Sequence, residues 1–196
     1  MICCAGMAVS GPVEIIDVAQ IKKQFDINTF GSIEVVQKFL PLIKKGKIVY
    51  ISSMAASGIF PFLSPYCASK KATDIMLNSL MNEFKNKDVK IVSVKPGCIV
   101  TPFWDKSVEA NIDNFESDKY HPEMVFMKKN AEHNAVHGTK PEKVAKLIFK
   151  IFKQKHPKLS YTIGWDSKMT MFLSRVLPVR MINFIVRFVM KSATTK

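Results

Sequence analysis

Short apolar runs rich in β-branched residues alternate along this chain with longer segments in which apolar residues recur at helical spacing. The short runs predict buried strands at Ile2–Cys4, Lys47–Ser52, Lys90–Val94 and Ser160–Ile163. The longer segments predict helices over residues 18–43 in two pieces, 64–84 and 139–154. Ser64 followed by Pro65, and Thr139, are the expected N-caps of the last two helices.

Strands that alternate with helices indicate βαβ units, and therefore an α/β fold with a doubly wound parallel sheet and helices on both faces. The length of 196 residues predicts one domain, residues 1–196, with an apolar and basic tail at 168–196. In such sheets the functional residues gather beyond the carboxyl ends of the strands.

Composition excludes several classes of protein. Apolar residues make up 47% of the chain and charged residues 23%, as in folded globular domains and unlike disordered, collagen-like or disulfide-scaffold proteins. Four cysteines at spacings that match no bridge framework or zinc pattern indicate a reducing compartment and no metal site. The N-terminus shows no basic region and no long apolar run, so no signal peptide is predicted and a cytoplasmic location is expected.

The net charge of +13 is distributed unevenly. Residues 139–196 contain thirteen basic and two acidic residues, a net +11, whereas residues 1–138 carry +2. A basic C-terminal third suggests an anionic partner, either a membrane or a nucleic acid. Lysines that keep the protein soluble account for the excess equally well. No nucleic-acid-binding module is recognisable, so no nucleic-acid partner is expected.

The tail after Pro178 has an amphipathic pattern. Arg180, Arg187 and Lys191 fall on one side of a helix, and apolar residues cover much of the remainder. A helix of this kind can lie in the interface of an anionic membrane, which would make the tail a peripheral membrane contact. Packing against a partner subunit explains the same pattern, and the sequence leaves both interpretations open.

The residues with the clearest chemistry follow the predicted strand Lys47–Ser52. Ser53 comes directly after it, and Tyr66 and Lys70 occupy positions i and i+4 of the next helix, on one face. A nearby ammonium group favours the phenolate and lowers the pKa of a tyrosine toward the range of a general acid–base catalyst. Tyr-x-x-x-Lys alone is a weak signal, because it arises often by chance.

The order of five motifs adds to that signal. This sequence resembles the short-chain dehydrogenase/reductase family, whose motifs match Cys4-Ala5-Gly6, Asp26-Ile27-Asn28, Ile51-Ser52-Ser53, Ser64 to Lys70 and Pro96 to Thr101. The resemblance covers residues 1 to about 165 and implies a Rossmann-like fold. The apolar tail is similar to segments beyond the core of retinol and hydroxysteroid dehydrogenases in that family.

The resemblance implies a catalytic tetrad of Tyr66, Lys70, Ser53 and Asn28. Tyr66 would exchange a proton with the substrate oxygen, Ser53 would orient that oxygen, Lys70 would lower the tyrosine pKa, and Asn28 would hold a water. It also implies NAD or NADP as cofactor, bound by Ala5, Gly6, Tyr66, Lys70, Pro96, Gly97, Ile99 and Thr101. A small alcohol or carbonyl substrate and a homo-oligomer are expected by the same analogy.

The chain departs from the family in one important respect. The family opens with a strand and a Gly-x-x-x-Gly-x-Gly turn that holds the pyrophosphate, and this sequence contains no such turn. Because one βαβ unit takes ~30 residues or more, roughly 80 residues of the family layout, its first βαβαβ portion, are lacking. A truncated sequence is expected, and a shorter variant without catalytic activity is the alternative.

The predicted function is an NAD(P)-dependent oxidoreductase that interconverts an alcohol and a ketone or aldehyde. An insertion from Phe103 to about Val136 is rich in aromatic and methionine residues, which suits a lid over a lipophilic substrate. Simple packing of that insertion explains its composition as well. The alternative function is a non-catalytic family member that binds a partner or a membrane surface.

Overall fold

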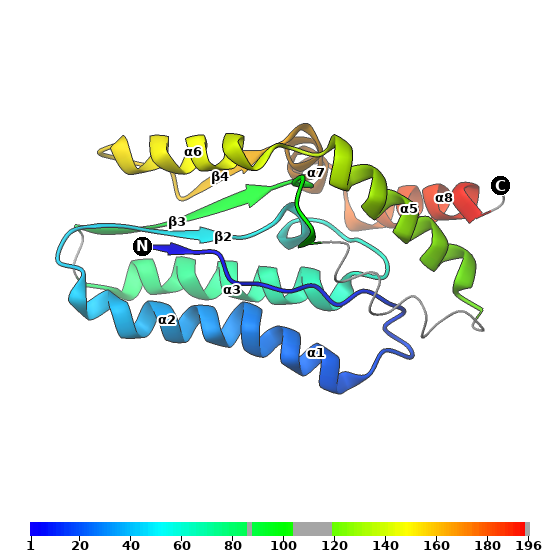
Figure 1. Ribbon diagram of the computed structural model, residues 1–196, viewed down its shortest axis with the longest axis horizontal. Helices are drawn as coiled ribbons and strands as arrows, with labels where there is room; N and C mark the ends of the chain where they lie inside the picture. Colours follow the sequence, from blue (N-terminus) through cyan, green and yellow to red (C-terminus); the bar gives the residue numbers. More distant parts are fainter. Residues whose placement is uncertain (86–87, 104–118, 195–196) are drawn as a thin grey trace.

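The computed structural model describes residues 1–85, 88–103 and 119–194 (Figure 1). Four strands form one parallel sheet in the order β1-β2-β3-β4. They are β1 (Ile2–Cys3), β2 (Gly46–Ile51), β3 (Val89–Pro96) and β4 (Ser160–Ile163). The four predicted strands are therefore confirmed, and so is the α/β class with a parallel sheet.

Helices cover both faces of this sheet, as right-handed βαβ connections require. One face carries α1 (Val18–Phe25), α2 (Gly31–Phe39) and α3 (Ser64–Glu83), and the other carries α6 (Pro141–Lys153) (Figure 1). Beyond the carboxyl edge of the strands lie α5 (His121–His137), α7 (Trp165–Val176) and α8 (Val179–Thr194).

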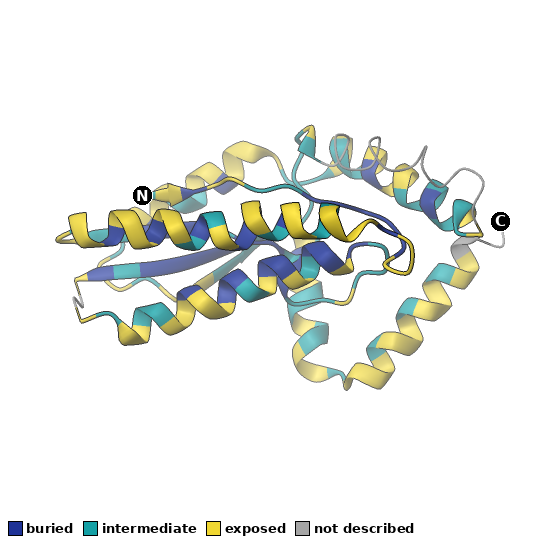
Figure 2. Cartoon of the chain, turned by 90° about the horizontal axis from the view of Figure 1, so that it is seen from below, coloured by how far each residue is buried: buried dark blue, intermediate teal, exposed yellow. Residues whose placement is uncertain are grey.

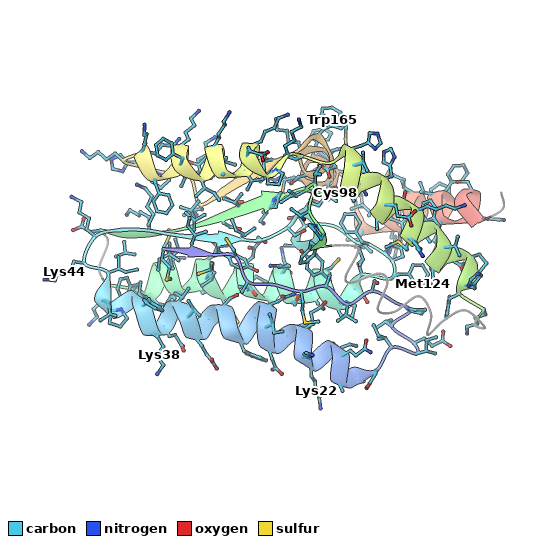
Figure 3. The ribbon with its side chains drawn as sticks, viewed as in Figure 1. Lys22, Lys38, Lys44, Cys98, Met124 and Trp165 are labelled. Atoms are coloured by element: carbon cyan, nitrogen blue, oxygen red, sulfur yellow. The ribbon has the colours of Figure 1, made fainter. Side chains whose placement is uncertain are left out.

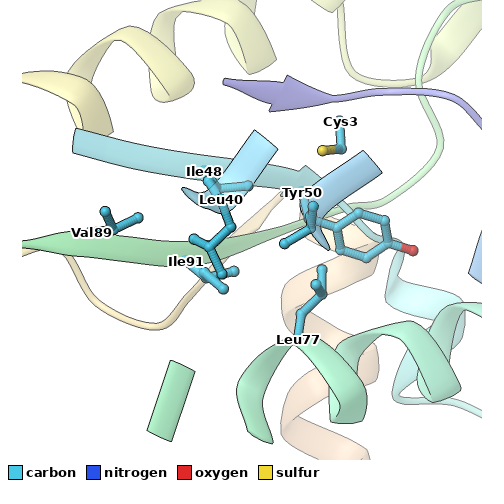
Figure 4. Close-up of a cluster of buried hydrophobic side chains, with 8 residues drawn as sticks. Cys3, Leu40, Ile48, Tyr50, Leu77, Val89 and Ile91 are labelled. Atoms are coloured by element: carbon cyan, nitrogen blue, oxygen red, sulfur yellow. The ribbon is translucent and has the colours of Figure 1, made fainter. Parts of the chain in front are cut away.

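Strand alternation divides the core into two layers. Ile48 and Tyr50 of β2 point toward the α2–α3 side, where Leu77 packs against them (Figure 4). Val49 of β2 points the other way and packs with Val144 and Ile151 of α6. Residues that face the sheet are buried and those that face outward are exposed, as Figure 2 shows for the helices. The side chain of each residue near the end of β2 therefore points toward one defined face of the sheet.

Two predicted helix caps lie elsewhere. Ser64 is the first residue of α3, and the buried Leu63 holds the N-cap position. Helix α6 begins at Pro141 with Lys140 as its N-cap. Thr139 cannot cap it through its backbone, because its amide donates to the Cys98 carbonyl at 2.8 Å and its carbonyl accepts from Val100 at 3.1 Å. These bonds tie the start of α6 to the end of β3.

The helical segment predicted in two pieces is continuous. A π-helical turn, Asp26–Phe30, joins α1 to α2 without a break. The Asn28 carbonyl in this turn accepts from the hydroxyls of Ser32 at 2.8 Å and Thr73 at 3.1 Å. Such turns recur at functional positions because they change the helical register locally. Here the turn anchors Asn28 against α3.

We expect Ile48→Ala to destabilise the protein by ~2–5 kcal/mol, because it removes a fully buried side chain and leaves a cavity. The matched control is Ile75→Ala on the outer side of α3, where the isoleucine is 55% exposed and the change should be close to neutral. Urea unfolding of both variants measures the difference. Equal losses of unfolding free energy would contradict the placement of Ile48.

Candidate active site

A cavity of about 400 Å³ opens at the carboxyl ends of β2 and β3. Eight of the residues predicted from sequence line it: Gly6, Ser53, Tyr66, Lys70, Pro96, Gly97, Ile99 and Thr101. Two predicted residues do not, since Ala5 is exposed and Asn28 is fully buried behind the wall. Phe103, the first residue of the predicted lid, also lines the cavity, together with residues that were not predicted to belong to the site: Cys4, Ile51, Ser52, Pro141, Val144, Ala145 and Ile148.

Lys70 is held in place from several sides. Its side chain is 3% exposed, and its Nζ donates to the Ile51 carbonyl at 3.1 Å. The same Nζ lies 5.1 Å from the centroid of the Tyr50 ring and 5.9 Å from that of Tyr66. Aromatic faces attract a cation, so both rings favour the ammonium form. Burial acts against it and lowers the pKa of Lys70 to about 8.

The pKa of Tyr66 differs from the expectation. Burial raises the pKa of this phenol to about 12, and a hydrogen bond with Ser53 acts in the opposite direction. Loss of hydration is the largest cause of this rise in the protein without ligands, and the predicted lowering by Lys70 stays a prediction. Tyr66 therefore keeps its proton at neutral pH.

Ser53 occupies the sharp exit of β2. It is the N-cap of a short 3₁₀ turn, Met54–Ala56, and its Oγ accepts from the Ala55 amide at 3.1 Å. This bond fixes the hydroxyl beside Tyr66, with which it also shares a hydrogen bond. Phe103 closes the other side, with its ring centroid 6.0 Å from that of Tyr66.

Asn28 acts in this structure as a structural link. Its Oδ1 accepts from the Met7 amide at 2.8 Å, and its Nδ2 donates to the Met7 carbonyl at 2.8 Å and to Ser69 Oγ at 3.0 Å. Both amide protons are used in these bonds. Asn28 thus joins the segment after β1 to α3, and its role in holding a water stays a prediction.

A buried ion pair supports the site from behind. Asp74 lies one turn after Lys70 on α3 and contacts Lys95 Nζ of β3 at 2.7 Å, with side chains 4% and 12% exposed. Ser93 Oγ donates to Asp74 Oδ1 at 2.9 Å. The carboxylate also raises the pKa of Lys70, against the larger effect of burial. The sequence analysis missed this pair, whose partners are far apart in the chain.

The turn after β3 is fixed by Asp166, a second residue that the sequence analysis missed. Asp166 Oδ2 accepts from the Cys98 amide at 2.6 Å, and a Cβ on Gly97 would lie 1.8 Å from Asp166 Oδ1. Only glycine fits beside this carboxylate. Figure 3 shows Cys98 at the end of β3 close to the start of α7, where Trp165 lies. An acid in the first turn of a helix was the available signal.

The predicted lid contributes little to the cavity in the described part of the chain. Trp104 and Phe115 lie outside the described residues. Tyr120, Met124, Phe126 and Met127 do not line the cavity, and Met124 is fully buried on α5.

The rings of His133 and His137 on α5 stack with their centroids 4.3 Å apart. The described residues contain no group of three side chains that could hold a metal ion.

A family model described as "short chain dehydrogenase" matches residues 1–112, which is more than half of the chain. The chain belongs to the short-chain dehydrogenase family. The family resemblance stated from the five motifs is thereby confirmed. Within the described residues, no helix combines the length and the apolar character needed to cross a bilayer.

Named relatives and a solved structure agree with this assignment. The chain is 28% identical over 188 residues to NADPH-dependent 3-dehydrocapnine reductase of Ornithobacterium rhinotracheale, covering 92% of this chain and 66% of that protein. It is 31% identical over 166 residues to Retinol dehydrogenase 8 of Bos taurus, covering 79% and 52%. A short-chain dehydrogenase structure from Streptomyces avermitilis superposes with a TM-score of 0.71 at 21% identity, covering 87% of this chain and 62% of that one. The chain thus spans 64–66% of the length of several curated relatives.

We predict that Lys70 of this short-chain dehydrogenase loses its charge near pH 8 as the pH rises, because burial disfavours the ammonium form. Carbon-13 NMR of lysine-labelled protein measures each Cε midpoint, and Lys70→Met assigns the signal. A full set of midpoints above 10 would contradict the prediction.

We predict that Asp74→Asn costs ~3–5 kcal/mol of unfolding free energy, because it leaves the buried Lys95 ammonium without its carboxylate. Removing both charges in Asp74→Asn/Lys95→Met should recover most of that loss. Asp74→Asn should also move the Lys70 midpoint below 8, since the carboxylate raises the pKa of Lys70. Equal stability of the single and double variants would show that the pair is not coupled.

Proposed function

We propose that this protein is an NAD(P)-dependent oxidoreductase that interconverts an alcohol and a ketone or aldehyde, with Tyr66 as general acid–base. The observation that carries this proposal is the meeting of Tyr66, Lys70 and Ser53 at one cavity beyond the strand ends. Three side chains from two elements converge there, and the phenol and the ammonium group are both buried. Buried titratable groups in a cleft at this place in the fold are typical of catalysis.

The cavity residues fit the nicotinamide end of such a cofactor. A Cβ on Gly6 would lie 3.2 Å from Lys70 Nζ and 3.3 Å from Asn28 Oδ1, so glycine keeps that wall open. Ser52 Oγ is buried at the cavity without a hydrogen-bond partner among the described residues. Lys70 would hold the ribose hydroxyls with the N–H groups that Ile51 does not use. When bound, the cofactor supplies the two-electron redox chemistry that no side chain of this cavity can provide.

The protein's own side chains transfer the proton and orient the substrate oxygen that receives or releases it. In reduction, Tyr66 donates its proton to the carbonyl oxygen, and in oxidation the phenolate accepts the proton of the alcohol. Ser53 donates a hydrogen bond to the same oxygen and polarises it. Lys70 stabilises the phenolate that remains. Because burial raises the pKa of Tyr66 to about 12 without ligands, the phenol still carries its proton at neutral pH.

An apolar substrate fits the surroundings of Tyr66. The phenol packs with Ala8 and Ala55, and Phe60 and Phe103 extend this apolar cluster. Phe60 also lines a second, smaller cavity of about 140 Å³ between the loop after the 3₁₀ turn and helices α7 and α8. The name of Retinol dehydrogenase 8 supports a lipophilic alcohol as the substrate class. These features support the prediction of a lipophilic substrate through one lid residue, Phe103, and through residues outside the lid.

The exposed apolar residues of α8, Phe184 and Phe188 among them, favour a second candidate, a non-catalytic family member that binds a partner or surface. Exposed apolar residues on the outer helices, Phe39 and Ile75 among them, support the further proposal of a homo-oligomer. The two candidates differ in whether the cavity turns over substrate.

We expect Tyr66→Phe to lower the rate of NAD(P)H-dependent reduction of apolar aldehydes or ketones by at least ~10²-fold, because it removes the proton donor. Cofactor binding should be retained, since the ring and Lys70 remain. The matched control is Tyr161→Phe, whose hydroxyl bonds Gln154 and the Lys158 amide away from the cavity. NAD(P)H absorbance measures the rate, and NAD(P)H fluorescence measures binding.

The same assay separates the two candidates. Turnover by the folded protein that falls only in Tyr66→Phe supports the oxidoreductase. Folded protein that neither binds NAD(P)H nor turns over substrate overturns the oxidoreductase for this chain and supports the non-catalytic candidate.

A further inference from the structure

Helices α7 and α8 project from the body beyond the carboxyl edge of the sheet (Figure 2). Helix α8 contacts α5 and α7. Its partly buried residues Ile182, Val186 and Met190 recur every four positions and form one face. We call α7 and α8 together the C-terminal arm, residues 165–194.

Helix α8 has a second apolar face that is largely exposed in the described part of the chain, although Ile185 at its border also lines the cavity beside Phe60. It consists of residues at i, i+3, i+4 and i+7 whose side chains are 42–72% exposed: Met181, Phe184, Ile185 and Phe188. A helix that only packs against its own body needs one apolar face, and the residues opposite are normally polar. Two exposed phenylalanines one turn apart therefore indicate a binding surface.

Helix α7 repeats this arrangement. Trp165, Met169, Phe172 and Val176 follow one another at spacings of four, three and four residues, and each is exposed. Trp165 is 75% exposed, with an apolar ring and a polar N–H group. Tryptophan is enriched where one end of a side chain meets an apolar phase and the other meets water. The pattern of α8 is thus a property of the whole arm.

Basic residues flank both apolar faces. Arg180, Arg187 and Lys191 lie on one stripe of α8 next to its exposed phenylalanines, and Lys168 and Arg175 accompany the apolar residues of α7. All five are exposed, and no acidic residue occurs after Asp166. Apolar side chains beside cations, without acids, match the composition of helices that lie on anionic membranes.

We propose that the C-terminal arm lies on the surface of an anionic phospholipid bilayer, with Phe184, Phe188 and Trp165 inserted at the interface. A second copy of the arm would bring five cations against five cations, and the one acid of the arm, Asp166, already accepts from the Cys98 amide. A nucleic acid would neutralise the cations and leave the apolar faces in water. A bilayer with anionic lipids satisfies both sets of side chains. The helices lie flat in this arrangement, consistent with their being unable to span the membrane.

The arm is joined to the proposed active site at its first turn. Asp166 of α7 bonds the turn after β3, and α7 and α8 form one wall of the apolar cavity beside Phe60. A bilayer bound to the arm would therefore lie close to the cavity side of the protein. Membrane binding itself needs neither cofactor nor turnover, so its test is independent of the proposed oxidoreductase activity.

Co-sedimentation of the whole chain with vesicles tests the proposal. Vesicles of phosphatidylcholine with 30 mol% phosphatidylserine, roughly the anionic content that such an arm requires, are compared with pure phosphatidylcholine vesicles. We expect binding to the anionic vesicles that weakens at high salt and is at least about tenfold weaker without phosphatidylserine. Equal binding to both vesicle types, or to neither, overturns the proposal.

Two arm variants and one matched control locate the binding surface. Phe184→Ser/Phe188→Ser should lose at least about tenfold in binding because it removes two inserted rings. Arg180→Glu/Arg187→Glu/Lys191→Glu should lose on the order of a hundredfold or more. The control, Ile75→Ser/Met76→Ser, changes two exposed apolar residues of α3 and should bind as the wild type does. Wild-type binding by both arm variants, or loss in the control alone, overturns the proposal.

Two further measurements test whether the arm itself contacts the lipid and whether a second copy of the chain covers it instead. Trp104→Phe leaves Trp165 as the sole tryptophan, whose fluorescence brominated lipids in the anionic vesicles should quench without any change to the arm. Absence of quenching in bound protein places the contact elsewhere and overturns the proposal. Light scattering measures the oligomeric state. A dimer that the phenylalanine variant converts to monomer, without vesicle binding by the wild type, makes a second copy the occupant of the arm.

Discussion

The buried face of α3 is polar, and the rest of the site depends on how its groups are satisfied. Tyr66, Ser69, Lys70, Thr73 and Asp74 all lie on that face and are at most 5% exposed. A buried polar group without a partner costs free energy comparable to a lost hydrogen bond, so each must meet a matching group. The helix can therefore dock on the sheet in one register only.

The partners of that face come from every element around it. Ser69 and Thr73 bond the π-helical turn at Asn28, Lys70 bonds the end of β2, and Asp74 bonds β3 through Lys95. Within the π-helical turn, the Asn28 carbonyl accepts hydrogen bonds from the Ser32 and Thr73 hydroxyls. The same hydrogen bonds thus specify the fold and the geometry of the candidate site. A substitution at one of these residues should lower the free energy of unfolding and also alter the geometry of the site.

The features predictable from sequence are those carried by local pattern. Strand positions follow from β-branched runs, and the shared face of Tyr66 and Lys70 follows from their spacing of four residues. Asp74–Lys95 and Asp166–Cys98 join residues 21 and 68 positions apart, which no local period connects. Tyr50 escaped notice because a tyrosine in an apolar strand is ordinary core until Lys70 is seen beside its ring. The predicted N-cap at Thr139 was wrong. There, backbone hydrogen bonds to the segment after β3 took precedence over the local preference of threonine for the N-cap position.

The charge state of the site follows from desolvation more than from pairing. Burial raises the pKa of Tyr66 and lowers that of Lys70, so each group is pushed toward its neutral form when the cavity holds no ligand. Groups that compensate the lost hydration, such as the Ile51 carbonyl, the Tyr50 ring and the Asp74 carboxylate, all act on Lys70. The hydrogen bond with Ser53 acts in this way on Tyr66. The side chains therefore favour an ammonium beside a neutral phenol near pH 7. A substrate oxygen that bonds both Tyr66 and Ser53 would meet a proton donor already in place, with the cation behind it ready to stabilise the phenolate once the proton has moved.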